Sequence, residues 1–387
     1  LVDFVSRSAP IADKLREAPE LLDELLFPKR LFTVPSREDI RTLLEAAMLD
    51  LDHEDLEAVM QHLRRFKDAI VFRVAASELE GAIPLKKVSD NLSFLAEVIV
   101  EKAVEVAYSN LINRHGEPTH GADFCVLAYG KLGGIELSYE SDLDLVFVSS
   151  DEKGVTNGPK PIDHQRFFTR LAQRVIHILS TNMMGGRLYE IDLRLRPNGD
   201  SGLLVTSLSA LQKYLEVDAW TWERQALVRA RPIAGGSSLI DAVAKLRIAI
   251  LSSERDAVAL QADVTSMRQK MREHQSDVGS KSKRRDLKYA RGGIVDIEFV
   301  VQYLVLRHAA RYPEVCSWSD VTHIVDNLEE VGVLTENNAN GLRSAYIQLR
   351  AAIHRIAMSY DTDDDLAQAE ESMAKARVVC AELLPNL

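Results

Sequence analysis

The sequence of 387 residues predicts an α+β protein that is mostly helical, with a small mixed sheet flanked by an N-terminal helical region and a C-terminal helical bundle. Three observations predict this class. Apolar residues recur every three or four positions up to about residue 115 and again after about 237, which is typical of packed helices. Between these regions, short apolar runs bounded by glycine alternate with a helical segment. The length favours two or three domains, and we divide the chain into 1–115, 116–236 and 237–387.

Helical spacing in the first region covers four segments, 18–26, 37–48, 56–79 and 91–113. Ser36 and Ser89 are the expected N-caps of the second and fourth, because a serine oxygen accepts a hydrogen bond from a free N–H of the first turn. In the last region, Gly292-Gly293 is expected to open one helix and Ser319-Asp320 to cap the next. Residues 281–285 form a basic run.

The middle region predicts three strands. Phe124–Ala128 and 143–148 are short apolar runs, and 188–195 alternates apolar and polar residues. A helix is expected at 166–179, and residues 155–161 predict a surface loop because they contain Asn-Gly-Pro.

Composition excludes several classes. A net charge of −11 argues against a general nucleic-acid-binding protein, which would usually be basic. The three cysteines have no metal-like spacing and suggest no disulfide framework, which fits a reducing, cytoplasmic setting. No apolar run approaches the roughly 20 residues that span a membrane, and the N-terminus has no secretory pattern. Because the chain lacks a starting Met, we expect it to be a piece of a longer protein.

The chemistry is concentrated in Tyr129-Gly130-Lys131-Leu132-Gly133-Gly134 and, shortly after, Ser141-Asp142-Leu143-Asp144-Leu145. Residues two apart in a strand share a face, so Asp142 and Asp144 should project together. Two adjacent carboxylates repel each other unless a cation lies between them, and Mg²⁺ prefers carboxylate and phosphate oxygens. The glycine turn would let backbone N–H groups approach a phosphate, although a glycine turn alone is usually only a turn.

A third carboxylate is predicted from the strand at 188–195. Alternation would place Glu190, Asp192, Arg194 and Arg196 on one face. That face is either a solvent-exposed surface of ion pairs or the place where Asp192 joins the first two aspartates. In the second case, Asp192 would bind a second metal ion and accept the proton of an attacking hydroxyl. Arg194 and Arg196 would pair with carboxylates or with triphosphate oxygens.

The segment 130–145 resembles the signature of the DNA polymerase β-like nucleotidyltransferase superfamily, although Lys131 stands where that pattern has a small residue. More narrowly, it resembles the bacterial bifunctional glutamine synthetase adenylyltransferase/adenylyl-removing enzymes. Four further stretches agree, at 189–197, 201–205, 220–231 and 292–299. That family has two similar halves, and residues 295–306 with the helical segment before the core resemble the C-terminal, adenylyltransferase half.

The resemblance implies transfer of AMP from ATP to a tyrosine hydroxyl of glutamine synthetase, with release of pyrophosphate, as a control of nitrogen metabolism. It implies two Mg²⁺ ions, with Asp142 and Asp144 binding both and Asp192 binding the second and the nucleophile. The residues expected to bind triphosphate are basic or lie in and near the glycine turn: Gly130, Lys131, Gly133, Gly134, Ser141, Arg194 and Arg196. Expected partners are glutamine synthetase and a PII-type signal-transduction protein, with glutamine as an effector.

Alternatives stay open. The chain could be the deadenylylase half, which uses phosphate to release ADP, or a regulatory module without catalysis that only docks the synthetase. A nucleotidyltransferase acting on a small molecule would not explain the match outside the core. Trp220 and Trp222 stack on adenine or a partner, or serve only packing, and Arg229 and Arg231 bind phosphate or form salt bridges. For Asp296 and Glu298 we favour a structural role.

Overall fold

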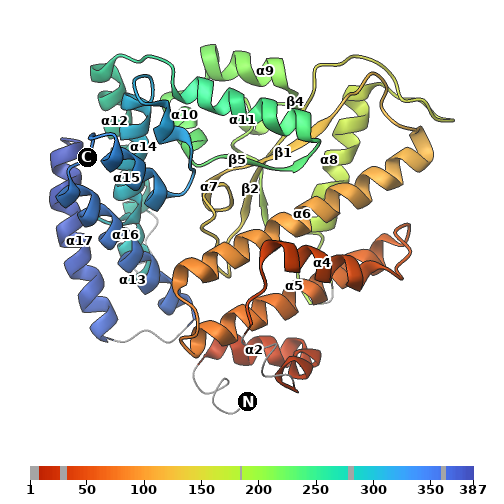
Figure 1. Cartoon of the computed structure of the whole chain (residues 1–387), viewed down its shortest axis with the longest axis horizontal. Coiled ribbons are helices and arrows are strands. Elements are labelled where there is room, and N and C mark those ends of the chain that lie inside the picture. The colour runs from red at the N-terminus through yellow and green to blue at the C-terminus, as the bar shows by residue number, and fades with distance from the viewer. Residues whose placement is uncertain (1–7, 27–32, 184, 278–282, 359–362) are drawn as a thin grey trace. The chain divides into compact units, whose positions relative to one another are not determined.

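The computed structural model describes residues 8–26, 33–183, 185–277, 283–358 and 363–387. These residues are mostly helical and include one five-stranded mixed sheet, which confirms the α+β class (Figure 1). By packing they form two compact units. The first contains Ile11–Asp218 and Ala230–Leu246, and the second contains Ala219–Arg229 and Arg247–Leu387 together with residues 8–10.

The N-terminal helices largely follow the predicted segments. They are α2 (Ala9–Glu17), the 3-10 helix η1 (Pro19–Leu26), α4 (Arg37–Met48), α5 (Leu56–Leu79) and α6 (Leu85–His115). Ser36 caps α4, as predicted, by accepting a hydrogen bond from the Asp39 N–H. The prediction that Ser89 caps a helix is wrong, because Ser89 is buried inside α6 and the N-cap is Pro84. The fixed φ of proline suits the start of a helix, so α6 begins earlier than its apolar spacing indicates.

The sheet contains β1 (Phe124–Ala128), β2 (Leu143–Ser149), β3 (Ile191–Asp192), β4 (Val205–Ser207) and β5 (Arg231–Gly235). The strand order is β3-β2-β1-β5, and β4 also pairs with β2. β1 is antiparallel to β2 and β5, whereas β3 and β4 are parallel to β2. The first two predicted strands are confirmed almost to the residue.

The third predicted strand is much shorter than expected. Only Ile191 and Asp192 pair with β2, and turns follow, so Glu190, Asp192, Arg194 and Arg196 do not lie on one strand face. The side chain of Asp192 accepts a hydrogen bond from the Arg194 backbone N–H, as in an Asx-turn, which ends the ladder.

Helices α4, α5, α6 and α8 (His164–Ser180) bury their apolar faces with the sheet in one continuous core. Leu143, Leu145 and Phe147 of β2 belong to this core and are almost fully buried. Asp144 alternates with them, as predicted, and is half-buried, whereas Asp142 lies just before the strand. In Figure 1, α6 and α8 lie beside β1 and β2. The N-terminal helices and the sheet share one hydrophobic core. The predicted domain boundaries at 115/116 and 236/237 stay a prediction.

After β3, the described residues form helices and loops apart from β4 and β5. The remaining elements are the 3-10 helix η2 (Gly199–Ser201), α9 (Leu208–Lys213), the π-helix η3 (Tyr214–Asp218), α10 (Thr221–Val228), α11 (Ser237–Leu251), α12 (Ala257–Asp277), α13 (Lys283–Tyr289), α14 (Ile294–His308), the 3-10 helix η4 (Pro313–Cys316), α15 (Val321–Glu330), α16 (Glu336–Ala357) and α17 (Asp363–Leu383). Gly293 and Asp320 are the N-caps of α14 and α15, as predicted. Part of the basic run at 281–285 lies outside the described residues.

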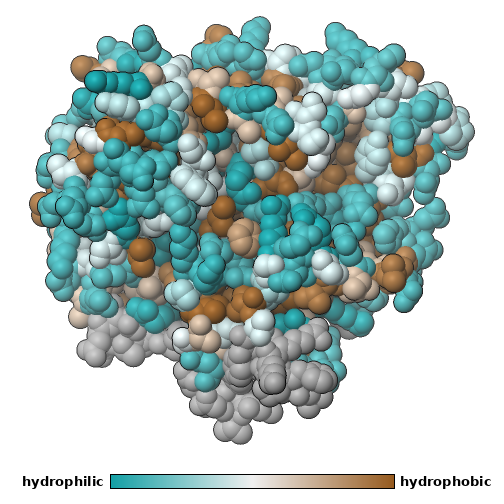
Figure 2. Space-filling view, in the orientation of Figure 1, coloured by the Kyte–Doolittle hydropathy of each residue, from teal (hydrophilic) through white to brown (hydrophobic). Residues whose placement is uncertain are grey.

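On the face shown in Figure 2, hydrophobic side chains are scattered among hydrophilic ones. None of the described helices has the length and apolar character needed to cross a membrane.

Candidate active site

The carboxylates of β2 and β3 are brought together by strand pairing. Asp144 of β2 and Asp192 of β3 are direct partners in the parallel register. Neighbouring strands lie about 4.8 Å apart, and paired residues present their side chains on the same face, so the two carboxylates are neighbours. Asp142 is exposed just before β2 and lines the same pocket as Asp192. Strand pairing therefore brings Asp144 and Asp192 side by side, and Asp142 shares a pocket with Asp192.

Gly130 begins the short helix α7 (Gly130–Gly133), directly against Asp144. Its φ is +58°, a conformation that favours glycine. A Cβ at this position would lie 2.2 Å from Oδ2 of Asp144, so a side chain there would displace the carboxylate. The glycine turn thus fixes where one carboxylate of the site can lie.

Asp192 is held by Arg194. The guanidinium Nε donates to Oδ1 at 3.0 Å and to Oδ2 at 2.8 Å, and a second guanidinium nitrogen also donates to Oδ2. These hydrogen bonds lower the pKa of Asp192 below its ordinary value, with a smaller contribution from the positive charge of Arg194. The pKa of Arg194 is raised, first by Asp192 and then by the charges of Asp144 and Asp142. Arg194 is thus the counter-ion of the aspartate cluster.

A pocket of about 530 Å³ opens beside these aspartates. Its lining combines Asp142 with residues from just before β3 to the turn after it: Glu190, Ile191, Asp192, Leu193, Arg194, Arg196 and Asp200. Arg196 donates from Nη1 to the Leu193 carbonyl at 2.8 Å and pairs with Asp200 at 3.3 Å. Its Nε is buried and has no hydrogen-bond partner within the part of the chain that the structure describes. The pocket therefore offers two arginines and two of the aspartates to one ligand.

Lys131 and Ser141 also lie together, as the phosphate hypothesis requires. Lys131 Nζ donates to Ser141 Oγ at 3.2 Å and to Ser138 Oγ at 3.4 Å. The backbone N–H groups of Gly133 and Gly134 donate to the carbonyls of Tyr129 and Gly130 inside the turn. A phosphate-binding role for Gly133 and Gly134 stays a prediction.

Carboxylate oxygens suit a divalent cation in their chemistry, since Asp144 and Asp192 are register partners and Gly130 leaves space against Asp144. Among the described residues, however, no three His, Cys, Asp or Glu side chains are close enough to form a ready metal site. The bond from Arg194 to Asp192 occupies one of the carboxylates. Metal binding by these residues therefore belongs to the proposal below.

Other residues singled out from the sequence have structural partners. Arg231 pairs with Glu97, whose side chain is fully buried, and Arg229 pairs with Glu298. Asp296 accepts hydrogen bonds from Arg268 and Arg272 at 2.7 and 2.8 Å. These contacts favour the salt-bridge interpretation of both arginines and the structural role of both acids.

Trp220 is 71% exposed, so it is not a core residue. The cysteines are all free and buried, and burial raises the pKa of Cys125 and of Cys380 to about 12. Inert thiols are what the sequence predicted.

Sequence reasoning missed two polar residues of the site, Ser138 and Asp200. Ser138 bonds Ser141 and Lys131, three and seven positions away. Asp200 pairs with Arg196 at a spacing of four residues. A spacing of four residues predicts a contact only within a helix. The turn that brings Arg196 and Asp200 together could not be recognised from the sequence.

The geometry defines a class of protein, an α+β protein with paired carboxylates on two strands, a glycine turn against one of them and a polar pocket beside the other. Residues 1–245 match the family model for glutamate-ammonia ligase adenylyltransferase, and residues 265–378 match the model for GlnD PII-uridylyltransferase. The chain belongs to the glutamate-ammonia ligase adenylyltransferase family.

Similar proteins carry the name bifunctional glutamine synthetase adenylyltransferase/adenylyl-removing enzyme. The protein of Hahella chejuensis is 46% identical over 92% of this chain and 38% of its own length. That of Idiomarina loihiensis is 44% identical over 90% and 37%, and that of Psychromonas ingrahamii is 42% identical over 97% and 41%. The chain thus spans about two fifths of the length of these relatives.

Proposed function

We propose that this chain transfers AMP from ATP to a tyrosine hydroxyl of glutamine synthetase and releases pyrophosphate. The observation that carries the proposal is the pairing of Asp144 with Asp192 across β2 and β3, beside Gly130. Membership of an adenylyltransferase family supports the reaction type. The same strand-and-turn arrangement supports a polymerase β-like core. The resemblance of residues 295–306 and of the helical segment before the core supports the C-terminal, adenylyltransferase half.

In this proposal, Asp142, Asp144 and Asp192 hold two Mg²⁺ ions. The ions would lower the pKa of the attacking hydroxyl and neutralise the leaving pyrophosphate. This help is needed because a free tyrosine hydroxyl has a pKa of about 10. Asp192 accepts the tyrosine proton.

Arg194 and Arg196 bind triphosphate oxygens from the pocket side, and Lys131 with Ser141 binds from the turn. Arg194, which pairs with Asp192, would gain the triphosphate as a second anionic partner. The unpartnered Nε of Arg196 supplies one donor for that purpose.

The experiment incubates the chain with glutamine synthetase, Mg²⁺ and ATP labelled in its α-phosphate. Transfer of label to the synthetase supports the proposal. If no label is transferred and phosphate instead releases AMP from modified synthetase, the activity is adenylyl removal, the second activity for which the relatives are named.

A regulatory docking module is the remaining alternative. It predicts binding of the synthetase without Mg²⁺-dependent ATP binding. ATP binding that disappears in the double variant Asp142→Asn and Asp144→Asn would exclude it.

The match of residues 265–378 to a PII-uridylyltransferase model supports a PII-type protein as partner, and we propose glutamine as an effector. A pull-down of the full chain with a PII-type protein, with and without glutamine, tests both. A cytoplasmic location follows from this set of partners.

A further inference from the structure

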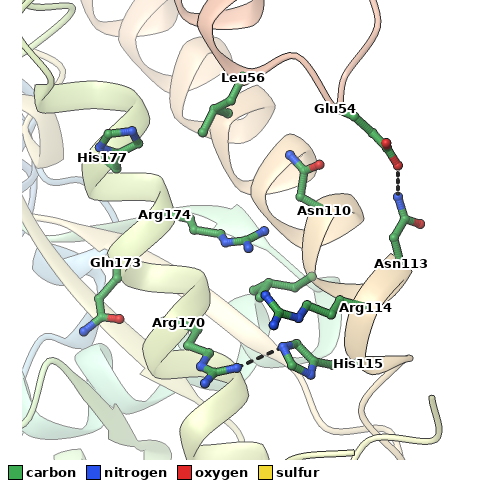
Figure 3. Close-up of a pocket in the computed structure, with 11 residues that line it drawn as sticks. Glu54, Leu56, Asn110, Asn113, Arg114, His115, Arg170, Gln173, Arg174 and His177 are labelled. Carbon is green, nitrogen blue, oxygen red and sulfur yellow. Dashed lines mark hydrogen bonds between the residues drawn. The ribbon is translucent and has the colours of Figure 1, made fainter. Parts of the chain in front are cut away.

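A second pocket, of about 660 Å³, lies between the C-terminal end of α6 and one face of α8 (Figure 3). It shares no residue with the pocket at Asp142 and Arg194. Arg170 and Arg174 reach into it from α8, and Arg114 and His115 face them from α6. Its lining is therefore basic.

His115 fixes the direction of one of these arginines. The ring is buried, and its Nδ1 lies 2.6 Å from the Lys160 carbonyl, to which it must donate. The other nitrogen, Nε2, is then an acceptor, and Nη1 of Arg170 donates to it at 2.9 Å. A neutral histidine thus holds a guanidinium at the pocket without cancelling its charge.

Within the described ranges, none of Arg114, Arg170 and Arg174 forms an ion pair with a carboxylate. Arg170 bonds His115 instead, and the charges that act on Arg174 are those of the other two arginines. The pocket's one carboxylate, Glu54, accepts instead from Asn113 Nδ2 at 3.1 Å. Burial, followed by the charges of Arg114 and Arg170, lowers the pKa of Arg174. Three like charges beside one another cost free energy that a bound anion would offset.

Favourable interaction with a helix end does not explain the cluster. Arg114 lies in the last turn of α6, where a cation stabilises the helix dipole. Arg170 and Arg174, however, lie in the middle of α8. Their positions one turn apart, facing Arg114, suit a shared ligand better than separate roles in helix stability.

We propose that this pocket binds the phosphate group of a small phosphorylated ligand. Guanidinium groups match phosphate oxygens with paired N–H donors, and a doubly charged group is needed to balance three arginines. The volume exceeds that of one phosphate, so an organic phosphate fits as well as the free ion. The site stands independently of the adenylyltransferase function.

The test measures binding of inorganic phosphate and of ribose 5-phosphate to the full chain by titration calorimetry and thermal melting, against sodium chloride of equal ionic strength. Arg174→Gln should weaken phosphate binding about tenfold or more, since a charge-assisted contact is lost. Arg166→Gln is the matched control, because Arg166 is exposed on the same helix and does not line the pocket. Without phosphate, Arg174→Gln should melt at or above the temperature of the unmodified chain.

Three outcomes would overturn the proposal. The first is phosphate binding no tighter than chloride binding, and the second is an unchanged phosphate affinity in both Arg174→Gln and Arg170→Gln. The third is loss of phosphate binding in Arg194→Gln alone, which would place the phosphate in the pocket that Arg194 lines. A lower melting temperature of Arg174→Gln with unchanged phosphate affinity would assign the arginine a structural role instead. Tighter binding of ribose 5-phosphate than of phosphate would identify an organic phosphate as the source, and equal binding the free ion.

Discussion

The sharpest test of the site is Gly130→Ala. The new Cβ would start 2.2 Å from Oδ2 of Asp144, whereas ordinary contacts begin at 3.4 Å. The carboxylate must therefore move by about 1 Å. A misplacement of about 1 Å in a catalytic constellation can cost about 100-fold in rate. We expect AMP transfer to fall by about that factor.

Backbone strain must be separated from this effect. Gly130 has a φ of +58°, and an alanine in that region costs about 1–2 kcal/mol, or a few degrees of melting temperature. Gly121→Ala is the matched control, because Gly121 has a φ of +69° and nothing within 4 Å of its added Cβ. Both variants should lose similar stability.

The assay is transfer of label from α-labelled ATP to glutamine synthetase, with melting curves recorded on the same samples. If Gly130→Ala and Gly121→Ala have the same transfer rate, whether both keep it or both lose it equally, the reaction does not depend on the position of the Asp144 carboxylate, and the reasoning is refuted.

Three further predictions follow from other contacts. Asp144→Asn should abolish label transfer yet melt close to the unmodified chain, since it relieves repulsion between neighbouring carboxylates; near-normal transfer would contradict the metal assignment. Burial lowers the pKa of Lys67 to about 8 in the folded chain, so between about pH 8 and 10.5 only the unfolded chain keeps this proton. The free energy of unfolding, measured in urea relative to Lys67→Met, should therefore rise by about 2 kcal/mol from pH 7.5 to 10. A difference between the two proteins that does not change with pH would refute this. Asp296→Asn leaves the buried Arg268 unpaired and should cost about 3 kcal/mol or more in the same assay, whereas a loss below about 1 kcal/mol would show that the pair is not needed.

Local patterns explain what the sequence could predict. Phe124–Ala128 matches β1 residue for residue, and the segments 37–48 and 56–79 match α4 and α5. In each case the signal is contained in the element itself: an apolar run, or apolar residues spaced at helical intervals. The alternation of Asp144 with Leu143 and Leu145 followed for the same reason.

Features that depend on packing between distant segments could not be predicted. Ser89 has the chemistry of a cap, but tertiary burial places it inside α6. The basic pocket joins Arg114 to Arg170 and Arg174, more than 50 positions later, and no local pattern connects them. Shared cores between the N-terminal helices and the sheet are likewise invisible in periodicity.

Asp192 combines both cases. Its place in the acidic cluster was predicted from a long alternating strand that the structure replaces with two residues and a turn. One register pair, Asp144 with Asp192, is enough to bring these two carboxylates side by side, whereas the role of Asp192 stays a prediction. The turn after β3 folds Arg194 back onto Asp192, a contact that an extended strand would not form. Arg194 thus supplies positive charge to a carboxylate that the proposed reaction assigns to a metal ion.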